Sequence, residues 1–200
     1  MTYSPKEELA NSITHGLGVL LLLVAVPLLV SWTVLHGSLP QVWGVGIFGF
    51  SMLLLYSAST LYHSISEPNL KKTFRLIDHI SIFFLIGGSY TPFMLTFLNN
   101  QTGYIVLSTV WGLAVIGILY KLFYMGKSKW FGIALYLLMG WLVVFVGDEI
   151  VGQMSAAALS WLIAGGLSYT IGVFFYRKKR CLFTTPSGTS LYWEAPSAIV

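Results

Sequence analysis

The 200-residue sequence contains very little charge: Asp, Glu, Lys and Arg together make up 9% of it, against roughly a quarter in ordinary soluble domains. Beside 56% hydrophobic residues, so little charge excludes both a soluble globular domain and a disordered chain. Cysteine is almost lacking too, because Cys181 is the single one, and this excludes a disulfide scaffold. The composition is that of an integral membrane protein.

What the sequence has instead is long apolar runs. A helix crosses the hydrocarbon layer, about 30 Å thick, in about 20 residues. Six runs meet this length, at residues 15–35, 42–64, 76–97, 104–124, 130–146 and 156–176. The first is too long for a signal peptide and follows acidic Glu7 and Glu8, so we expect it to remain in the mature protein. The sequence predicts an all-α fold, a polytopic membrane helical bundle with six evident spans.

The 11 Lys and Arg residues are confined to alternate connections. They lie before the first expected span and after the second, fourth and sixth: Lys6; Lys71, Lys72 and Arg75; Lys121, Lys127 and Lys129; Arg177, Lys178, Lys179 and Arg180. The positive-inside rule therefore predicts a cytoplasmic N-terminal segment (1–14), a six-span membrane domain (15–176), and a cytoplasmic basic junction and tail (177–200). Topology and anionic headgroups account for these short clusters, so we expect membrane lipids as partners and no nucleic acid. The oligomeric state is left open.

Several ionisable or polar residues lie at membrane depth, where they are costly and mark candidate functional sites. His63 is near the cytoplasmic end of the second span, and Ser59 precedes it by one turn on the same face. Asp78 begins the third span, and the short basic loop returns it toward His63. A third group shares one face of the first helix at i, i+3 and i+7: Glu8, Asn11 and His15. Their convergence on one leaflet predicts a polar site there.

The same residues also have a purely structural interpretation. Asp78 fits the first turns of a helix, Ser59 can bond to its own helix backbone, and a lone histidine is often a packing residue. Zinc takes three protein ligands and a water, and His63 is only one of them. Spacing alone therefore leaves a metal site and a structural role both open.

Three stretches carry a family resemblance: EELANSITHG, SASTLYHS and DHISIFFLIGGSYTPF, supported by LYKLF and LMGW. Over about residues 5–180, the chain resembles the hemolysin III family of bacterial membrane proteins. That family is related to the adiponectin and progestin receptors and to the alkaline ceramidases. The resemblance implies seven transmembrane helices, an N-terminus in the cytoplasm of a bacterial cell and a location in its inner (plasma) membrane.

The resemblance also implies a zinc ion near the cytoplasmic leaflet. His63 would be one ligand, and a His-x-x-x-His pair on the seventh helix would supply two more. Asp78 would polarise the metal-bound water, Ser59 would contact that water or the substrate, and Glu8, Asn11 and His15 would support the site. Zinc lowers the pKa of bound water toward neutrality, and a carboxylate can take its proton. Hydrolysis of a lipid amide or ester is the implied reaction.

The chain departs from the family at its C-terminal end. After Arg180 it reads CLFTTPSGTSLYWEAPSAIV, which contains no histidine, so the seventh helix and two expected ligands are missing. With permitted third bases, a shifted reading frame gives PFHHAIWHLFVLGGAICH, an apolar run with a His-x-x-x-His pair. One hypothesis is therefore a frameshift after Arg180, and the other is an ordinary divergent tail. As written, the chain is expected to bind zinc weakly.

Three functions follow from these patterns. The first is a zinc-dependent lipid amide or ester hydrolase-like or lipid-sensing protein with a cytoplasmic-side site. The second is a membrane-disrupting (haemolytic) protein, although the uniformly apolar spans carry no polar stripe of the kind that would line a pore. The third is a non-catalytic protein of membrane homeostasis.

Overall fold

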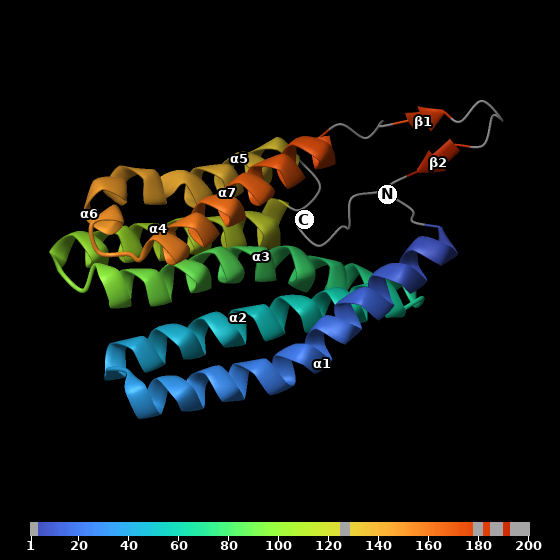
Figure 1. The fold of residues 1–200 in the computed structure, drawn as a ribbon. Coiled ribbons are helices and arrows are strands. Elements are labelled where there is room, and N and C mark those ends of the chain that lie inside the picture. Colours follow the sequence, from blue (N-terminus) through green and yellow to red (C-terminus); the bar gives the residue numbers. More distant parts are fainter. Residues whose placement is uncertain (1–3, 125–128, 178–181, 185–189, 193–200) are drawn as a thin grey trace. The chain divides into compact units, whose positions relative to one another are not determined.

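The computed structural model describes residues 4–124, 129–177, 182–184 and 190–192, and helices dominate it (Figure 1). The chain forms two compact units, Met1–Met154 and Ser155–Val200. Most of the expected basic junction and tail lies outside the described residues, so the frameshift hypothesis is not tested by the structure.

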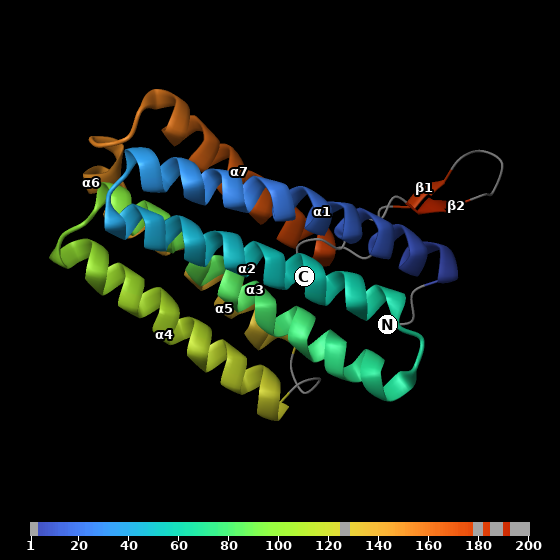
Figure 2. The ribbon, with the colours of Figure 1, turned by 90° about the horizontal axis from the view of Figure 1, so that it is seen from below.

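The first unit is helical along its described length. Its elements are α1 (Pro5–His36), α2 (Leu39–Ser64), α3 (Pro68–Phe97), α4 (Gln101–Tyr124), α5 (Lys129–Trp141), a 3-10 helix η1 (Leu142–Val146) and α6 (Gly147–Val151). Connections of a few residues join the first four helices, and each packs against the one before it, as Figure 2 shows. α1 and α3 therefore begin at the same end of the bundle, where α2 and α4 end.

Local sequence signals set where the helices start. Ser4 and Glu7 form a capping box ahead of α1: the Ser4 N–H donates to Glu7 (2.5 Å) and the Glu7 N–H to the Ser4 hydroxyl (3.3 Å). At α3, the Glu67 carboxylate accepts from the N–H groups of Asn69 (3.0 Å) and Leu70 (2.6 Å). These two hydrogen bonds hold the pKa of Glu67 below its ordinary value. α1 consequently begins at Pro5, within the segment expected to precede the first span.

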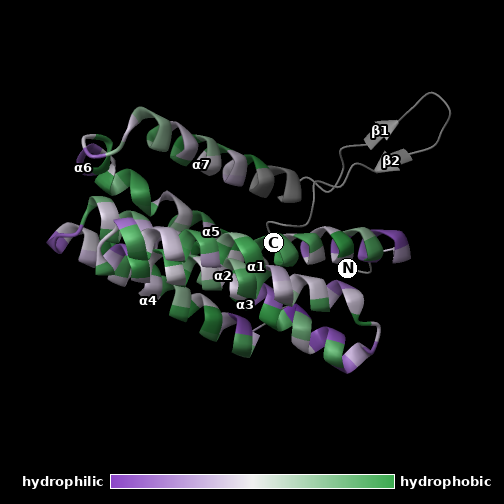
Figure 3. Cartoon of the chain, turned by 60° about the horizontal axis from the view of Figure 1, so that its bottom comes forward, coloured by the Kyte–Doolittle hydropathy of each residue, from purple (hydrophilic) through white to green (hydrophobic). Residues whose placement is uncertain are grey.

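Within the described residues, five helical segments are long and apolar enough to cross a membrane: Pro5–His36, Leu39–Ser64, Pro68–Phe97, Gln101–Tyr124 and Trp130–Val151. A shorter apolar helical stretch covers Ala156–Ile171. Many large apolar side chains are exposed, such as Leu35 and Phe145, which lipid rather than water would accommodate. Hydrophilic residues of the first unit gather toward the helix ends (Figure 3). The predicted polytopic membrane helical bundle is confirmed.

Small residues let α2 and α3 approach closely, as is common between membrane helices. A methyl group added at Gly44 would lie 2.7 Å from the Cα of Pro92, and one added at Gly88 would overlap Ser51. The interior is filled by larger apolar residues, among them Phe83, Met94 and Met139, which are almost fully buried. The α2–α3 contact is the most extensive of the molecule, and it places the candidate site residues of these two helices beside each other.

The fifth span, expected as one helix over 130–146, is interrupted at Trp141 and continues to Val151. The Tyr90 hydroxyl of α3 lies 2.8 and 3.0 Å from the carbonyl oxygens of Met139 and Gly140, and it accepts a hydrogen bond from the Val143 N–H (2.9 Å). A break at membrane depth is tolerated when other groups satisfy the released backbone. Tyr90 supplies those hydrogen bonds here.

The second unit contains α7 (Ala156–Arg177) and two short strands, β1 (Leu182–Thr184) and β2 (Ser190–Tyr192). The strands pair antiparallel, with Phe183 opposite Leu191. Within the part of the chain that the structure describes, no further helix follows α7.

Candidate functional site

Glu8 joins three helices at the end of the bundle where α1 and α3 begin. One carboxylate oxygen accepts a hydrogen bond from Nδ1 of His63 on α2 (2.6 Å), and the other pairs with Nζ of Lys71 on α3 (2.8 Å). His63 is buried, with 6% of its surface exposed. A carboxylate cannot donate, so Nδ1 carries the proton and, in the neutral ring, Nε2 carries the lone pair. Glu8 thus sets both the tautomer and the orientation of His63.

His15, about two turns after Glu8 in α1, packs against His63. The two rings are stacked, with centroids 6.0 Å apart and planes inclined by 10°, and the Tyr56 ring lies roughly perpendicular to His15 with the centroids 5.7 Å apart. His15 is buried to the same extent as His63. Because the rings are stacked, they do not direct two nitrogens toward a common point between them.

Ser59 and Asp78 form a second buried pair, one turn deeper in α2 than His63. Their side chains are close enough to interact with each other, and the residues are 3% and 4% exposed. His79 lies 3.6 Å from Asp78, but its Nδ1 is hydrogen bonded to the Arg75 carbonyl oxygen at 2.7 Å. The Asp78 carboxyl group is therefore directed to the α2 side by Ser59.

The structure brings together five of the six residues expected at the site: Glu8, His15, Ser59, His63 and Asp78. Asn11 is the exception: beyond the backbone of α1, the described residues give it a hydrogen bond from the Thr14 hydroxyl to its carbonyl oxygen (3.1 Å), and none that joins its side chain to the site. The residue that sequence reasoning missed is Lys71, which it counted only as a topology signal. Besides pairing with Glu8, its ammonium group donates to the Ile65 carbonyl (3.2 Å) and lies 5.2 Å from the centre of the Tyr62 ring.

The donors at this site do not make up a zinc centre. Across the described residues, no group of three His, Cys, Asp or Glu side chains is arranged to hold a metal ion. His63 offers one imidazole nitrogen, whereas zinc takes at least three protein ligands. In metal sites, a histidine ligand is usually oriented by a hydrogen-bond partner on its other ring nitrogen, and Glu8 has this position relative to His63. The described residues therefore supply one histidine of the ligand type with its supporting carboxylate, and the other zinc ligands are not among them.

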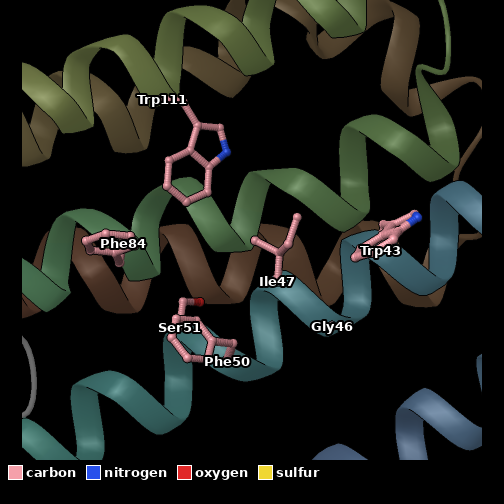
Figure 4. Close-up of a pocket in the computed structure, with 7 residues that line it drawn as sticks. All are labelled: Trp43, Gly46, Ile47, Phe50, Ser51, Phe84 and Trp111. Atoms are coloured by element: carbon pink, nitrogen blue, oxygen red, sulfur yellow. The ribbon is translucent and has the colours of Figure 1, made fainter.

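An apolar pocket of about 420 Å³ lies farther along the bundle, lined by Trp43, Gly46, Ile47, Phe50, Ser51, Phe84 and Trp111 (Figure 4). Two of its polar groups bond within the protein: Ser51 donates to the Phe48 carbonyl (2.7 Å), and Trp111 donates to the Thr91 hydroxyl (3.2 Å). Ser51 precedes Ser59 by eight residues of α2, about 12 Å along the axis. The pocket is therefore separate from the polar site.

Comparison with known proteins agrees with the motifs at this site. A family model described as "Haemolysin-III related" matches residues 3–189. The chain is 41% identical to the Hemolysin-3 homolog of Bacillus subtilis (strain 168) over 90% of this chain and 85% of that protein. It is 38% identical to Hemolysin-3 of Bacillus cereus (88% and 80%) and 26% identical to the human monocyte to macrophage differentiation factor (86% and 71%). No solved structure matches.

Proposed function

The chain belongs to the haemolysin III-related family of membrane proteins, and on this basis we propose that its buried polar site binds membrane lipid from the cytoplasmic side. The observation that carries the proposal is the buried Ser59–Asp78 pair beside His63. Buried polar groups at membrane depth are costly and are retained for function. The basic connections on this side support a cytoplasmic orientation, and the two Bacillus relatives support a bacterial plasma (inner) membrane.

The chemistry available at the site is that of lipid amide or ester hydrolysis. Asp78 can accept a proton from water or from a hydroxyl group of the lipid. Ser59 holds the carboxyl group in place, and Glu8 presents Nε2 of His63. In the family, zinc would supply Lewis acidity, but the described residues do not complete its ligand set. Lipid binding is therefore the activity proposed for this chain as written, and hydrolysis for a form whose residues after Arg180 complete the metal site.

The decisive experiment restores the seventh helix. A variant in which the shifted-frame sequence replaces the residues after Arg180 is reconstituted with zinc, and fatty-acid release is followed from a ceramide and from a phosphatidylglycerol. We expect release by this variant, and a loss of about 100-fold or more on Asp78→Asn, because a general base contributes that much. Thr73→Ala, on the exposed face of α3, is the control and should keep the rate.

Each other outcome rejects a stated part of the proposal. Release that survives Asp78→Asn rejects the role of Asp78 as the base. No release, with zinc bound, rejects hydrolysis and leaves lipid binding or membrane homeostasis without catalysis. The nucleotide sequence tests the frameshift directly: an alternative frame without an apolar, histidine-bearing segment after Arg180 rejects it.

Membrane disruption is the second candidate, favoured by the printed names of the two Bacillus relatives. The exposed surfaces of the spans are rich in large apolar side chains, which suit contact with lipid more than a water-filled pore. Leakage of a trapped dye from vesicles distinguishes this function: leakage by the purified chain in the absence of any lipid hydrolysis would favour it.

A further inference from the structure

We propose that the apolar pocket shown in Figure 4 binds one acyl chain of a membrane glycerolipid, and that the ester carbonyl of this chain accepts a hydrogen bond from Trp43. The pocket lies between three helices: α2 supplies most of its lining, α3 supplies Phe84 and α4 supplies Trp111. Each of these helices is long and apolar enough to cross a membrane. The volume of the pocket, about 420 Å³, is within the range of ligand pockets in proteins.

The pocket runs along α2 from the membrane interface toward the middle of the bilayer. Trp43 lies four residues after the first residue of α2, Leu39, at the end of the bundle opposite to the polar site. Phe50 lies farther along the same helix, about 10 Å from Trp43 in the direction of the axis. Acyl chains also extend from the interface toward the middle of the bilayer, so the pocket has the orientation that one chain requires.

The pocket and the polar site use opposite faces of α2. Trp43 precedes Ser59 by 16 residues, and Ile47 precedes His63 by the same number. At 3.6 residues per turn, this spacing separates the members of each pair by about 160° around the helix. Trp43 and Phe50 are each 62% exposed, so the pocket is continuous with the apolar surface of the bundle that lipid covers. The inference therefore goes beyond the lipid binding proposed for the polar site.

Gly46 leaves open space in the wall of the pocket. A methyl group added at Gly46 would have no other atom within 4 Å. Two other glycines of α2 differ, because a methyl group added at Gly44 would lie 2.7 Å from Pro92 and one added at Gly49 would overlap Val26. Neighbouring helices thus fill the space beside Gly44 and Gly49 but not the space beside Gly46. An acyl chain there would gain dispersion contacts that the protein does not provide.

Trp43 supplies a hydrogen-bond donor at the interface end of the pocket. The other indole, that of Trp111, donates to Thr91 (3.2 Å), whereas no group of the described residues accepts a hydrogen bond from the Trp43 N–H. Figure 4 shows the Trp43 nitrogen on the side of the ring away from the other labelled side chains. Indole rings favour the membrane interface, where their N–H groups find polar partners. The ester carbonyl is the acceptor attached to an acyl chain, so one lipid can both fill the pocket and accept this hydrogen bond.

The test measures lipid binding to the purified full-length chain by native mass spectrometry. The probes are a phosphatidylcholine with two ester-linked chains and its ether-linked analogue, which has the same chains but lacks both carbonyl oxygens. We expect the ester lipid to bind about threefold more tightly than the ether lipid, as one hydrogen bond contributes. In Trp43→Phe, which keeps an aromatic ring but lacks the N–H, the two lipids should bind equally.

A second pair of variants tests the space beside Gly46. Gly46→Leu fills the pocket and should weaken binding of both lipids about fivefold, because the acyl chain loses its dispersion contacts. Gly112→Leu is the matched control: Gly112 is exposed on α4, an added methyl group there also has no atom within 4 Å, and the residue does not line the pocket. It should change binding by less than about twofold, as is usual for surface substitutions.

Several results would overturn the proposal. Equal weakening by Gly46→Leu and Gly112→Leu would indicate nonspecific contact with the helix surface, and unchanged binding in Gly46→Leu would leave the pocket without an acyl chain. Equal binding of the ester and ether lipids by the wild-type chain would reject the role of Trp43. A wild-type dimer that Gly46→Leu abolishes would identify a second copy as the occupant. If Gly46→Leu does not fold, Phe50→Ala removes an exposed wall of the pocket instead and should weaken binding to a similar extent.

Discussion

Glu8 on α1 links the end of α2 and the start of α3 to its own helix through side-chain contacts. Its two oxygens bind groups on α2 and α3 that are 55 and 63 residues away in the chain. Hydrogen bonds in which one partner is charged are shorter and stronger than neutral ones, and both distances here are below 3 Å. The half-buried Glu8 carboxylate thereby compensates one cation and orients His63. This explains why an acidic residue is retained so close to the apolar part of α1.

Removal of Glu8 is expected to destabilise the bundle. Glu8→Ala breaks both contacts and leaves the buried His63 N–H without its acceptor, at a cost of about 2 kcal/mol, which corresponds to about 4–8 °C in the unfolding midpoint for a chain of this size. Glu8→Gln keeps an acceptor for His63 and should cost less. Thermal unfolding in detergent measures both. Lys6→Ala, exposed at the start of α1, is the control, and equal effects of Lys6→Ala and Glu8→Ala would contradict the assignment.

At the level of helices, the contact between α2 and α3 depends on glycine. Gly44 is buried against the backbone of Pro92. A methyl group added at Gly44 would lie 2.7 Å from the Cα of Pro92, and a backbone atom cannot move aside as a flexible side chain can. Gly46, two residues later on the same helix, has nothing within 4 Å of an added methyl group. The two glycines have the same helix propensity but different surroundings.

This difference gives a matched pair of variants. Gly44→Ala should destabilise the protein by about 1–3 kcal/mol, because overpacking forces backbone shifts. Gly46→Ala should be neutral or slightly stabilising, since alanine favours a helix. Unfolding midpoints in detergent compare the two directly. If Gly46→Ala were the more harmful variant, the close approach of α2 and α3 at Gly44 would be wrong.

On the scale of the whole molecule, the described residues do not gather a complete set of metal ligands. His63 is oriented by Glu8, yet the described residues place no group of three donors together, and the tail after Arg180 contains no histidine. Weak binding by one imidazole cannot retain zinc through purification. The purified chain is therefore expected to contain well under one zinc ion per molecule by elemental mass spectrometry.

The variant with a restored seventh helix provides the contrast for that measurement. It should contain about one zinc ion per molecule, and His63→Ala in that background should lose it, because zinc needs the complete set of ligands. A stoichiometric zinc content in the chain as written would refute the prediction.

The sequence by itself determined the membrane class, the main apolar segments, the family and the general region of the polar site. These properties are local: twenty apolar residues identify a span wherever it lies, and Ser59 and His63 share a face because they are four residues apart on one helix. Their separation from Asp78 is bridged by a short loop, which is why that proximity could also be predicted.

Only the tertiary structure decided which groups touch. From the sequence, Lys71 indicated only topology, and the structure shows that it pairs with Glu8. Asn11 shares a helix face with Glu8 and His15, but among the described residues no hydrogen bond joins it to His63. The break after Trp141 depends on Tyr90, about fifty residues away in the chain. The close approach of Gly132 on α5 to the Lys121 side chain on α4 likewise joins two helices. The physical reason is that hydropathy sets how a helix partitions, whereas its rotation and contacts follow from packing against neighbours distant in sequence.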